Sequence, residues 1–154
     1  MADPLISVAK TIKNEGGWVD NPNDPGGVTN MGITQRDMPG QNMRELPIAQ
    51  ATAYYMQNYV KLLYPQIQSQ AVLDKLIDMG VLFGVGEAVE QLQSVLAVTV
   101  DGQFGEVTLQ AVNTAAGSLL ASYKTAMKQR AYEIVALHPS EVVFEAGWAA
   151  RIDS

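Results

Sequence analysis

The segment from Glu15 to Thr34 most limits how this chain can fold, because it cannot continue the helical pattern on either side of it. It reads EGGWVDNPNDPGGVTNMGIT and contains five glycines and two prolines. Its Asn-Pro, Asp-Pro and Gly-Gly pairs are typical of turns, and only residues 28–33 resemble a strand. We therefore expect a loop that can fold back on the preceding helix and that carries a small β-hairpin.

The rest of the chain has apolar residues at helical spacing, interrupted by glycine and proline. Asp3 and Pro4 are typical of the start of a helix, and Gly16 and Gly17 should end that helix. The sequence thus predicts a single, mostly α-helical domain of the α+β type, with one small hairpin next to the loop. The other expected helices cover residues 47–63, 70–83, 86–97, 106–115, 118–137 and 141–151.

The composition excludes several kinds of function. There is no cysteine, and His138 is the single histidine, so disulfides, a thiolate nucleophile and a multi-histidine metal site are excluded. We therefore expect no metal and no cofactor. The net charge of −6 does not favour nucleic acid or an anionic membrane as the partner. No stretch approaches the roughly 20 apolar residues of a membrane span, and we expect a monomer that buries its own core.

Four interpretations of the loop compete. A calcium-binding loop that begins at Asp20 would need glycine at its sixth position and glutamate at its twelfth, but Pro25 and Met31 stand there. A phosphate-binding loop would need a lysine before a helix, and Asp24 would repel phosphate. A turn-rich connector without further function and a site built on carboxylates both remain open.

The carboxylate interpretation starts from Glu15 at the end of the first expected helix, where the helix dipole disfavours the ionised form. Apolar cover from Trp18 would favour the protonated form as well, and a protonated glutamic acid can protonate a poor leaving group. Asp24 and the water-holding hydroxyl of Thr29 would complete a glycosidase site. Asp20 is the rival second carboxylate, and a solvated glutamate at a helix end is the alternative for Glu15.

This segment resembles the signature of glycoside hydrolase family 108, the N-acetylmuramidase family of lysozyme-like proteins. The family pattern runs roughly from Glu-x-Gly-Gly to Asp-x-Gly-Gly-x-Thr-x-x-Gly-Ile-Thr with slightly variable spacing, and residues 15–17 and 24–34 fit it closely. The resemblance continues at Asp78 in LIDMGVLFGVGEAVEQLQ, in VDGQFGEVTLQAV and in GWAAR. One departure is Leu82, which stands where the family has asparagine. We expect this change to affect affinity or substrate preference more than chemistry.

The resemblance implies hydrolysis of the β-1,4 bond between N-acetylmuramic acid and N-acetylglucosamine in peptidoglycan glycan strands. Glu15 would be the general acid, Asp24 would stabilise developing charge or activate water, and Thr29 would orient that water. The glycines would let a sugar approach the backbone and the aromatic residues would stack on it, although core packing is the more frequent role of such tyrosines. The expected substrate-binding residues are Gly16, Gly17, Trp18, Gly27, Asn30, Gly32, Tyr55 and Tyr59.

The resemblance also concerns the second half of the chain. It implies one lysozyme-like domain over residues 1–154, in which a helical peptidoglycan-domain-like half, 71–154, packs on a catalytic muramidase half, 1–70. We expect Trp148 to anchor the last helix in the core and Arg151 to pair with a nearby carboxylate.

A noncatalytic peptidoglycan-binding module or a secretion accessory protein is the competing hypothesis, and the VDGQFGEVT turn is its best support. The first residues, MADPLISVAKTIKNEGG, lack the basic start and the unbroken apolar run of a signal peptide. We therefore expect synthesis in the bacterial cytoplasm and release to the wall by a holin pore or another export route. That setting fits a phage endolysin or a bacterial lytic enzyme.

Overall fold

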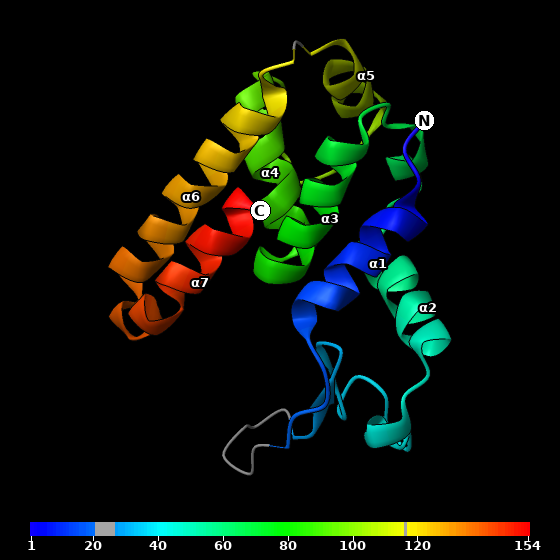
Figure 1. Cartoon of the computed structure of the whole chain (residues 1–154). Helices are drawn as coiled ribbons and strands as arrows, with labels where there is room; N and C mark the ends of the chain where they lie inside the picture. The colour runs from blue at the N-terminus through cyan, green and yellow to red at the C-terminus, as the bar shows by residue number, and fades with distance from the viewer. Residues whose placement is uncertain (21–26, 116) are drawn as a thin grey trace.

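Figure 1 shows the computed structural model of the chain, which describes residues 1–20, 27–115 and 117–154. Most of the described chain is helical, and two short strands form the one small antiparallel sheet of the described part. The prediction of a mostly helical fold with a small hairpin is confirmed. The helices are α1 (Pro4–Glu15), α2 (Ile48–Tyr59), α3 (Gln70–Phe83), α4 (Val85–Leu96), α5 (Glu106–Thr114), α6 (Leu119–Leu137) and α7 (Val142–Asp153), the strands are β1 (Thr29–Asn30) and β2 (Ile33–Thr34), and the 3-10 turns are η1 (Met43–Glu45), η2 (Tyr64–Gln66) and η3 (Pro139–Glu141).

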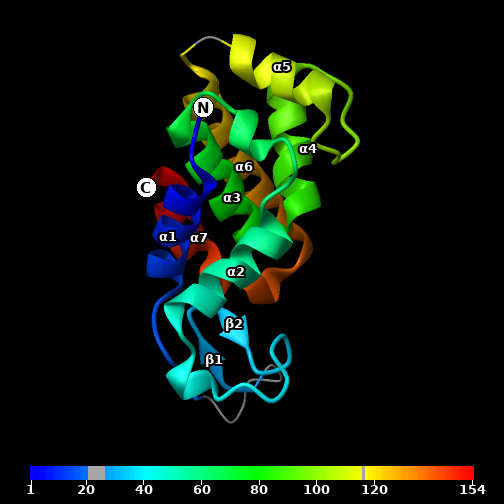
Figure 2. The same cartoon turned by 90° about the vertical axis from the view of Figure 1, so that its right-hand side faces the viewer.

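The hairpin and α5 lie at opposite ends of the molecule. In both Figure 1 and Figure 2 the hairpin lies beyond the C-terminal end of α1, and α5 lies at the other end. Helix α3 packs against α1 on one side and α4 on the other. Helix α7 returns along α6 and also contacts α3. Within the described ranges, no helix is both long enough and apolar enough to cross a bilayer.

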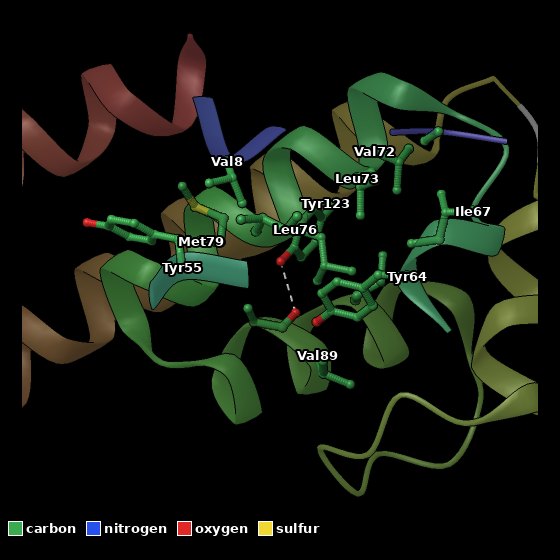
Figure 3. Close-up of a cluster of buried hydrophobic side chains, with 14 of the residues drawn as sticks. Val8, Tyr55, Tyr64, Ile67, Val72, Leu73, Leu76, Met79, Val89 and Tyr123 are labelled. Atoms are coloured by element: carbon green, nitrogen blue, oxygen red, sulfur yellow. Dashed lines mark hydrogen bonds between the residues drawn. The ribbon is translucent and has the colours of Figure 1, made fainter. Parts of the chain in front are cut away.

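The core is one cluster of buried side chains that draws on both halves of the chain. Figure 3 shows that apolar residues of α3, such as Leu73 and Leu76, meet Val8 of α1 and Val89 of α4 there. Tyr123 of α6 is completely buried, and its hydroxyl donates a hydrogen bond to the carbonyl oxygen of Ala88 at 2.9 Å, which satisfies the one polar atom of the ring. Helix α3 begins at the expected boundary and packs against helices of both halves, α1 and α4. The expected division into halves at residue 70 stays a prediction.

Local chemistry explains where α1 begins and ends. The carboxylate of Asp3 accepts a hydrogen bond from the backbone N–H of Leu5 at 2.9 Å, and Pro4 occupies the first helical turn. Gly16 has a φ of 81°, a conformation that favours glycine and ends the helix. The turn at Gly16 directs the chain away from α1 just after Glu15.

The second helix is shorter than the expected range of 47–63. The chain leaves the helical conformation at Val60 and forms the 3-10 turn η2. Tyr64 and Ile67 are buried by this turn, at 1% and 0% exposure. Burial of these two apolar side chains therefore outweighs the local helical pattern.

Candidate active site

Glu15 is the last residue of α1, and the tip of the hairpin passes directly over its side chain. A Cβ atom placed on Gly32 would lie 2.6 Å from Oε2 of Glu15 and 2.5 Å from the hydroxyl oxygen of Tyr55. Separations this short leave room for glycine only. The hairpin tip, Glu15 and Tyr55 therefore form one close-packed group at the C-terminal end of α1.

A two-residue turn brings the hairpin to this position. Met31 and Gly32 have φ values of 50° and 74°, as a type I′ turn requires at its two central residues. On either side of the turn, Asn30 pairs with Ile33, whose side chain is fully buried. Ile33 thus anchors the hairpin in the core while the turn reaches Glu15.

Tyr55 holds the turn from the side of α2. Its hydroxyl donates a hydrogen bond to the carbonyl oxygen of Met31 at 2.8 Å, and its side chain is only 1% exposed. Burial first, and the charge of Glu15 second, raise the pKa of Tyr55. Tyr59 packs on this ring at 5.4 Å between centroids and remains half-buried. Tyr55 therefore supports the hairpin, whereas Tyr59 keeps surface that a ligand can reach.

Arg151 of α7 brings a positive charge to Glu15. Its Nη2 atom lies 2.6 Å from Oε1 of Glu15 and 2.9 Å from Oδ1 of Asp78, and its Nε atom donates to the same Oδ1 at 3.1 Å. Burial lowers the pKa of Arg151, but hydrogen bonds and charge from Asp78 and Glu15 outweigh it and raise that pKa. The prediction that Arg151 pairs with a carboxylate is confirmed. That one of its two partners is Glu15 could not be predicted, because the contact joins distant parts of the chain.

Lys75 continues this group of charges behind Asp78. Its Nζ atom donates to the backbone carbonyl oxygen of Arg151 at 2.8 Å and lies 3.9 Å from Oδ2 of Asp78. Both side chains of this pair are 7% exposed. Burial is the main cause that lowers the pKa of Lys75. Two cations and two carboxylates from α1, α3 and α7 thus neutralise one another at the site.

The other expected catalytic residues are placed as follows. Thr29 lies in β1, half-buried, and its backbone pairs both with Thr34 and with Val19 at the start of the loop. Its role in catalysis stays a prediction. Asp24 lies outside the described residues. Asp20 is exposed, as a turn residue facing solvent would be.

Like Tyr55, two further expected substrate-binding side chains have partners within the protein. Asn30 is buried, and its Nδ2 atom donates to the carbonyl oxygen of Met43 at 2.7 Å. This bond fastens the hairpin to η1. Trp18 is 38% exposed, and the guanidinium carbon of Arg44 lies 4.6 Å from its ring centroid in a cation–π contact. Apolar cover of Glu15 by Trp18 stays a prediction.

The remaining expected glycines lie along the loop. Gly16 and Gly17 are exposed, with no heavy atom within 4 Å of a Cβ placed on either. Gly27 has a φ of 75°, and a Cβ there would meet Cβ of Gln35 at an ordinary 3.8 Å. These positions leave open space next to the backbone, as the approach of a sugar would require. Their contact with substrate stays a prediction.

An aromatic group formed by the last residue of α3 and the first two turns of α7 was not among the expected site residues. The ring of Trp148 lies 5.4 Å from that of Phe83 and 6.1 Å from that of Phe144. Trp148 is half-buried against the core, as expected of an anchor for the last helix. It precedes Arg151 by three residues and therefore shares its face of α7. The helical spacing of residues 144, 148 and 151 was the sequence signal for this face.

Two family models match the sequence. Residues 8–84 match the model for Glycosyl hydrolase 108, and residues 87–153 match a model described as a predicted peptidoglycan domain. Among solved structures, the chain is similar to SagA of Brucella abortus, a lysozyme-like fold, with 28% identity and a TM-score of 0.75 over 97% of this chain and 89% of that one. The comparison with curated proteins gave no match.

Proposed function

Because this chain belongs to the glycosyl hydrolase 108 family, we propose that it is an N-acetylmuramidase. The two family matches make it a peptidoglycan-related glycoside hydrolase. The proposal adds the bond that is cleaved, the β-1,4 bond from N-acetylmuramic acid to N-acetylglucosamine. The observation that carries it is the position of Glu15 under the hairpin tip, because a general acid must be held in a fixed direction toward the glycosidic oxygen.

Glu15 is the general acid in this mechanism, and it must carry a proton when the leaving sugar departs. Arg151 pairs with Glu15 and with Asp78 at once, at 2.6 Å and 2.9 Å. When Glu15 is neutral, Asp78 still satisfies the guanidinium. The second carboxylate therefore keeps a largely buried cation paired in both protonation states of Glu15, which avoids the large penalty of an unpaired buried charge.

Asp24 and Thr29 complete the proposed mechanism. Asp24 stabilises the developing positive charge on the sugar or activates water, and Thr29 orients that water. A separation of about 5 Å between the Glu15 and Asp24 carboxyl groups would suit retention, and about 6.5–9.5 Å would suit inversion. We favour inversion. The proposed setting is a monomer that acts on the bacterial wall, as a phage endolysin or a bacterial lytic enzyme.

A noncatalytic peptidoglycan-binding module is the alternative, and the match of residues 87–153 to a predicted peptidoglycan domain favours it. The two functions differ in what they require of Glu15. A binding module would tolerate loss of this carboxylate, whereas a muramidase would not.

The test compares the natural chain with a Glu15→Gln variant on purified peptidoglycan. The fragments are reduced with borohydride and analysed by mass spectrometry. Reduced muramic acid ends that disappear in the variant support the proposal. Reduced glucosamine ends would mean that another bond is cleaved, and equal lysis by both proteins would remove Glu15 from its role. Glu106→Gln, at the exposed start of α5, is the matched control and should keep full activity.

A further inference from the structure

A pocket of about 510 Å³ adjoins the candidate active site. Side chains of α1, α3 and α6 line it, and two of them, Asn14 and Asp78, connect it to the site. Asn14 directly precedes Glu15, and Asp78 accepts the hydrogen bonds from Arg151. The volume lies within the range of about 300–1,000 Å³ that is usual for ligand-binding pockets.

The lining of this pocket is unusual for a protein with a net charge of −6. Four of the six lysines of the chain line it, against two carboxylate side chains, Asp74 and Asp78, and the last residue of this sequence, Ser154. Positive charges gathered at one place in an acidic protein attract an anion selectively to that place. The four lysines are Lys10, Lys13, Lys75 and Lys124.

The two carboxylates are already occupied by groups of the protein. Asp74 forms an ion pair with Lys10 and accepts hydrogen bonds from Ser7 at 2.6 Å and Gln70 at 2.7 Å. Burial raises the pKa of Asp74, but these bonds outweigh it and lower that pKa. Asp78 pairs with Arg151 at 2.9 Å and lies 3.9 Å from Nζ of Lys75. The two carboxylates thus serve Lys10, Arg151 and Lys75, and no carboxylate among the described residues forms an ion pair with Lys13 or Lys124.

Those lysines have hydrogen-bond donors to spare. Lys13 is exposed at the mouth of the pocket, and no partner for it is found among the described residues. Lys124 donates to the carbonyl oxygen of Asp153 at 2.8 Å, which uses one of its three donors. Burial is the main cause that lowers the pKa of Lys75; the charge of Asp78 opposes it, and the charges of Lys124 and Arg151 add to it. These cations repel one another, so a bound anion would relieve that repulsion.

We propose that this pocket binds a carboxylate of the peptide stem that N-acetylmuramic acid carries. The inference rests on the proposed function and adds a second point of substrate recognition. The peptide hangs from the same sugar whose glycosidic bond is cleaved, so its carboxylates must lie near the general acid. The pocket meets this condition, because its lining includes Asn14, the neighbour of Glu15 in the chain, and Asp78, which shares Arg151 with Glu15.

Binding is tested by NMR titration of the full chain with the acidic dipeptide L-alanyl-γ-D-glutamate at low salt. The variants are Lys13→Gln, whose side chain is exposed, and the double variant Lys13→Gln/Lys124→Gln. We expect the double variant to raise Kd by about tenfold, the effect of losing charge-assisted hydrogen bonds. Lys61→Gln removes the same charge on an exposed residue outside the pocket and should leave Kd within about twofold. Melting curves identify any variant that has lost its fold.

Three results would overturn the inference. The first is no binding of the dipeptide, and the second is a double variant that binds it as tightly as the natural chain does. The third is acetate that binds as tightly as the dipeptide, which would indicate an unspecific anion site.

A kinetic experiment compares intact peptidoglycan with glycan stripped of its peptides by an amidase. The natural chain should show the lower KM on the intact substrate, and the double variant should lose this preference. Failure of the proposed function is read separately, because it would show as lysis by Glu15→Gln and would leave dipeptide binding unchanged.

Discussion

The Nη2 atom of Arg151 lies 2.6 Å from Oε1 of Glu15, although the two residues stand 136 positions apart in the chain. Glu15 belongs to the segment that matches the glycosyl hydrolase model, and Arg151 belongs to the segment that matches the peptidoglycan-domain model. The second segment therefore does more than accompany the first, because it supplies the counter-charge of the proposed general acid.

Replacing Arg151 tests this relationship. Arg151→Leu should lower the free energy of unfolding by about 3 kcal/mol, because Asp78 would lose its main partner inside the protein. Urea unfolding followed by circular dichroism measures the change. Arg44→Leu, which loses the contact with Trp18, should cost about 1 kcal/mol or less. Equal losses in the two variants would contradict the importance of the Arg151 ion pair.

Gly32 is expected to be irreplaceable. In Gly32→Ala the new methyl group would fall within 2.5–2.7 Å of the Tyr55 hydroxyl and the Glu15 side chain. Either the hairpin tip or the Glu15 and Tyr55 side chains must then shift, which should abolish most of the activity and destabilise the fold by about 1–3 kcal/mol through overpacking. Gly40→Ala is the matched control, since Gly40 has a similar φ of 82° but open space around it. The difference between the two variants isolates the steric contact from the backbone strain.

The hydroxyl of Tyr55 should contribute through its bond to Met31. Tyr55→Phe keeps the buried ring but leaves the Met31 carbonyl without this donor, so the free energy of unfolding should fall by about 1 kcal/mol. Thermal and urea unfolding measure it, with Tyr132→Phe on the exposed face of α6 as control. A change in kcat without a loss of stability would instead assign the hydroxyl a direct part in the reaction.

The tyrosines should make the protein sensitive to alkali. Burial raises the pKa of Tyr54 to about 12, and burial also raises those of Tyr55, Tyr59, Tyr64 and Tyr123. Above pH 10 the unfolded chain loses these protons while the folded chain keeps them, so stability falls as pH rises from 10 toward 12.

Urea unfolding at pH 8, 10 and 11, together with absorbance at 295 nm, tests this prediction. Tyrosine ionisation should accompany unfolding rather than precede it. Tyr54→Phe should give a shallower decline in stability with pH than the natural chain. A stability that stays constant up to pH 11 would contradict the expected effect of burial on the tyrosine pKa values.

Local sequence patterns were sufficient for much of the fold. The Asp3-Pro4 start and the Gly16 end of α1, and the glycine of the hairpin turn, each act within a few residues, so their chemistry is visible in the sequence. The end of α2 was placed too late, because the burial of Tyr64 and Ile67 depends on the rest of the core. Tertiary packing decides such boundaries.

The candidate site could be predicted only in part for the same reason. Glu15 stands out by its position at a helix end, and the loop glycines by their spacing. The site around Glu15 joins Gly32 of the hairpin, Tyr55 of α2 and Arg151 of α7, which lie far apart in the sequence. No pattern in one sequence indicates which of the expected carboxylates Arg151 will reach, since that depends on how α7 packs on α3.

The ion pair between Glu15 and Arg151 also bears on when the protein can become active during its synthesis. A growing chain on the ribosome completes α1, the hairpin and α2 long before residue 151 emerges. Until then Glu15 lacks both its counter-charge and the helix that supplies it. A nascent or interrupted chain therefore holds the proposed acid in an unfinished setting, and translation itself delays the assembly of the lytic site.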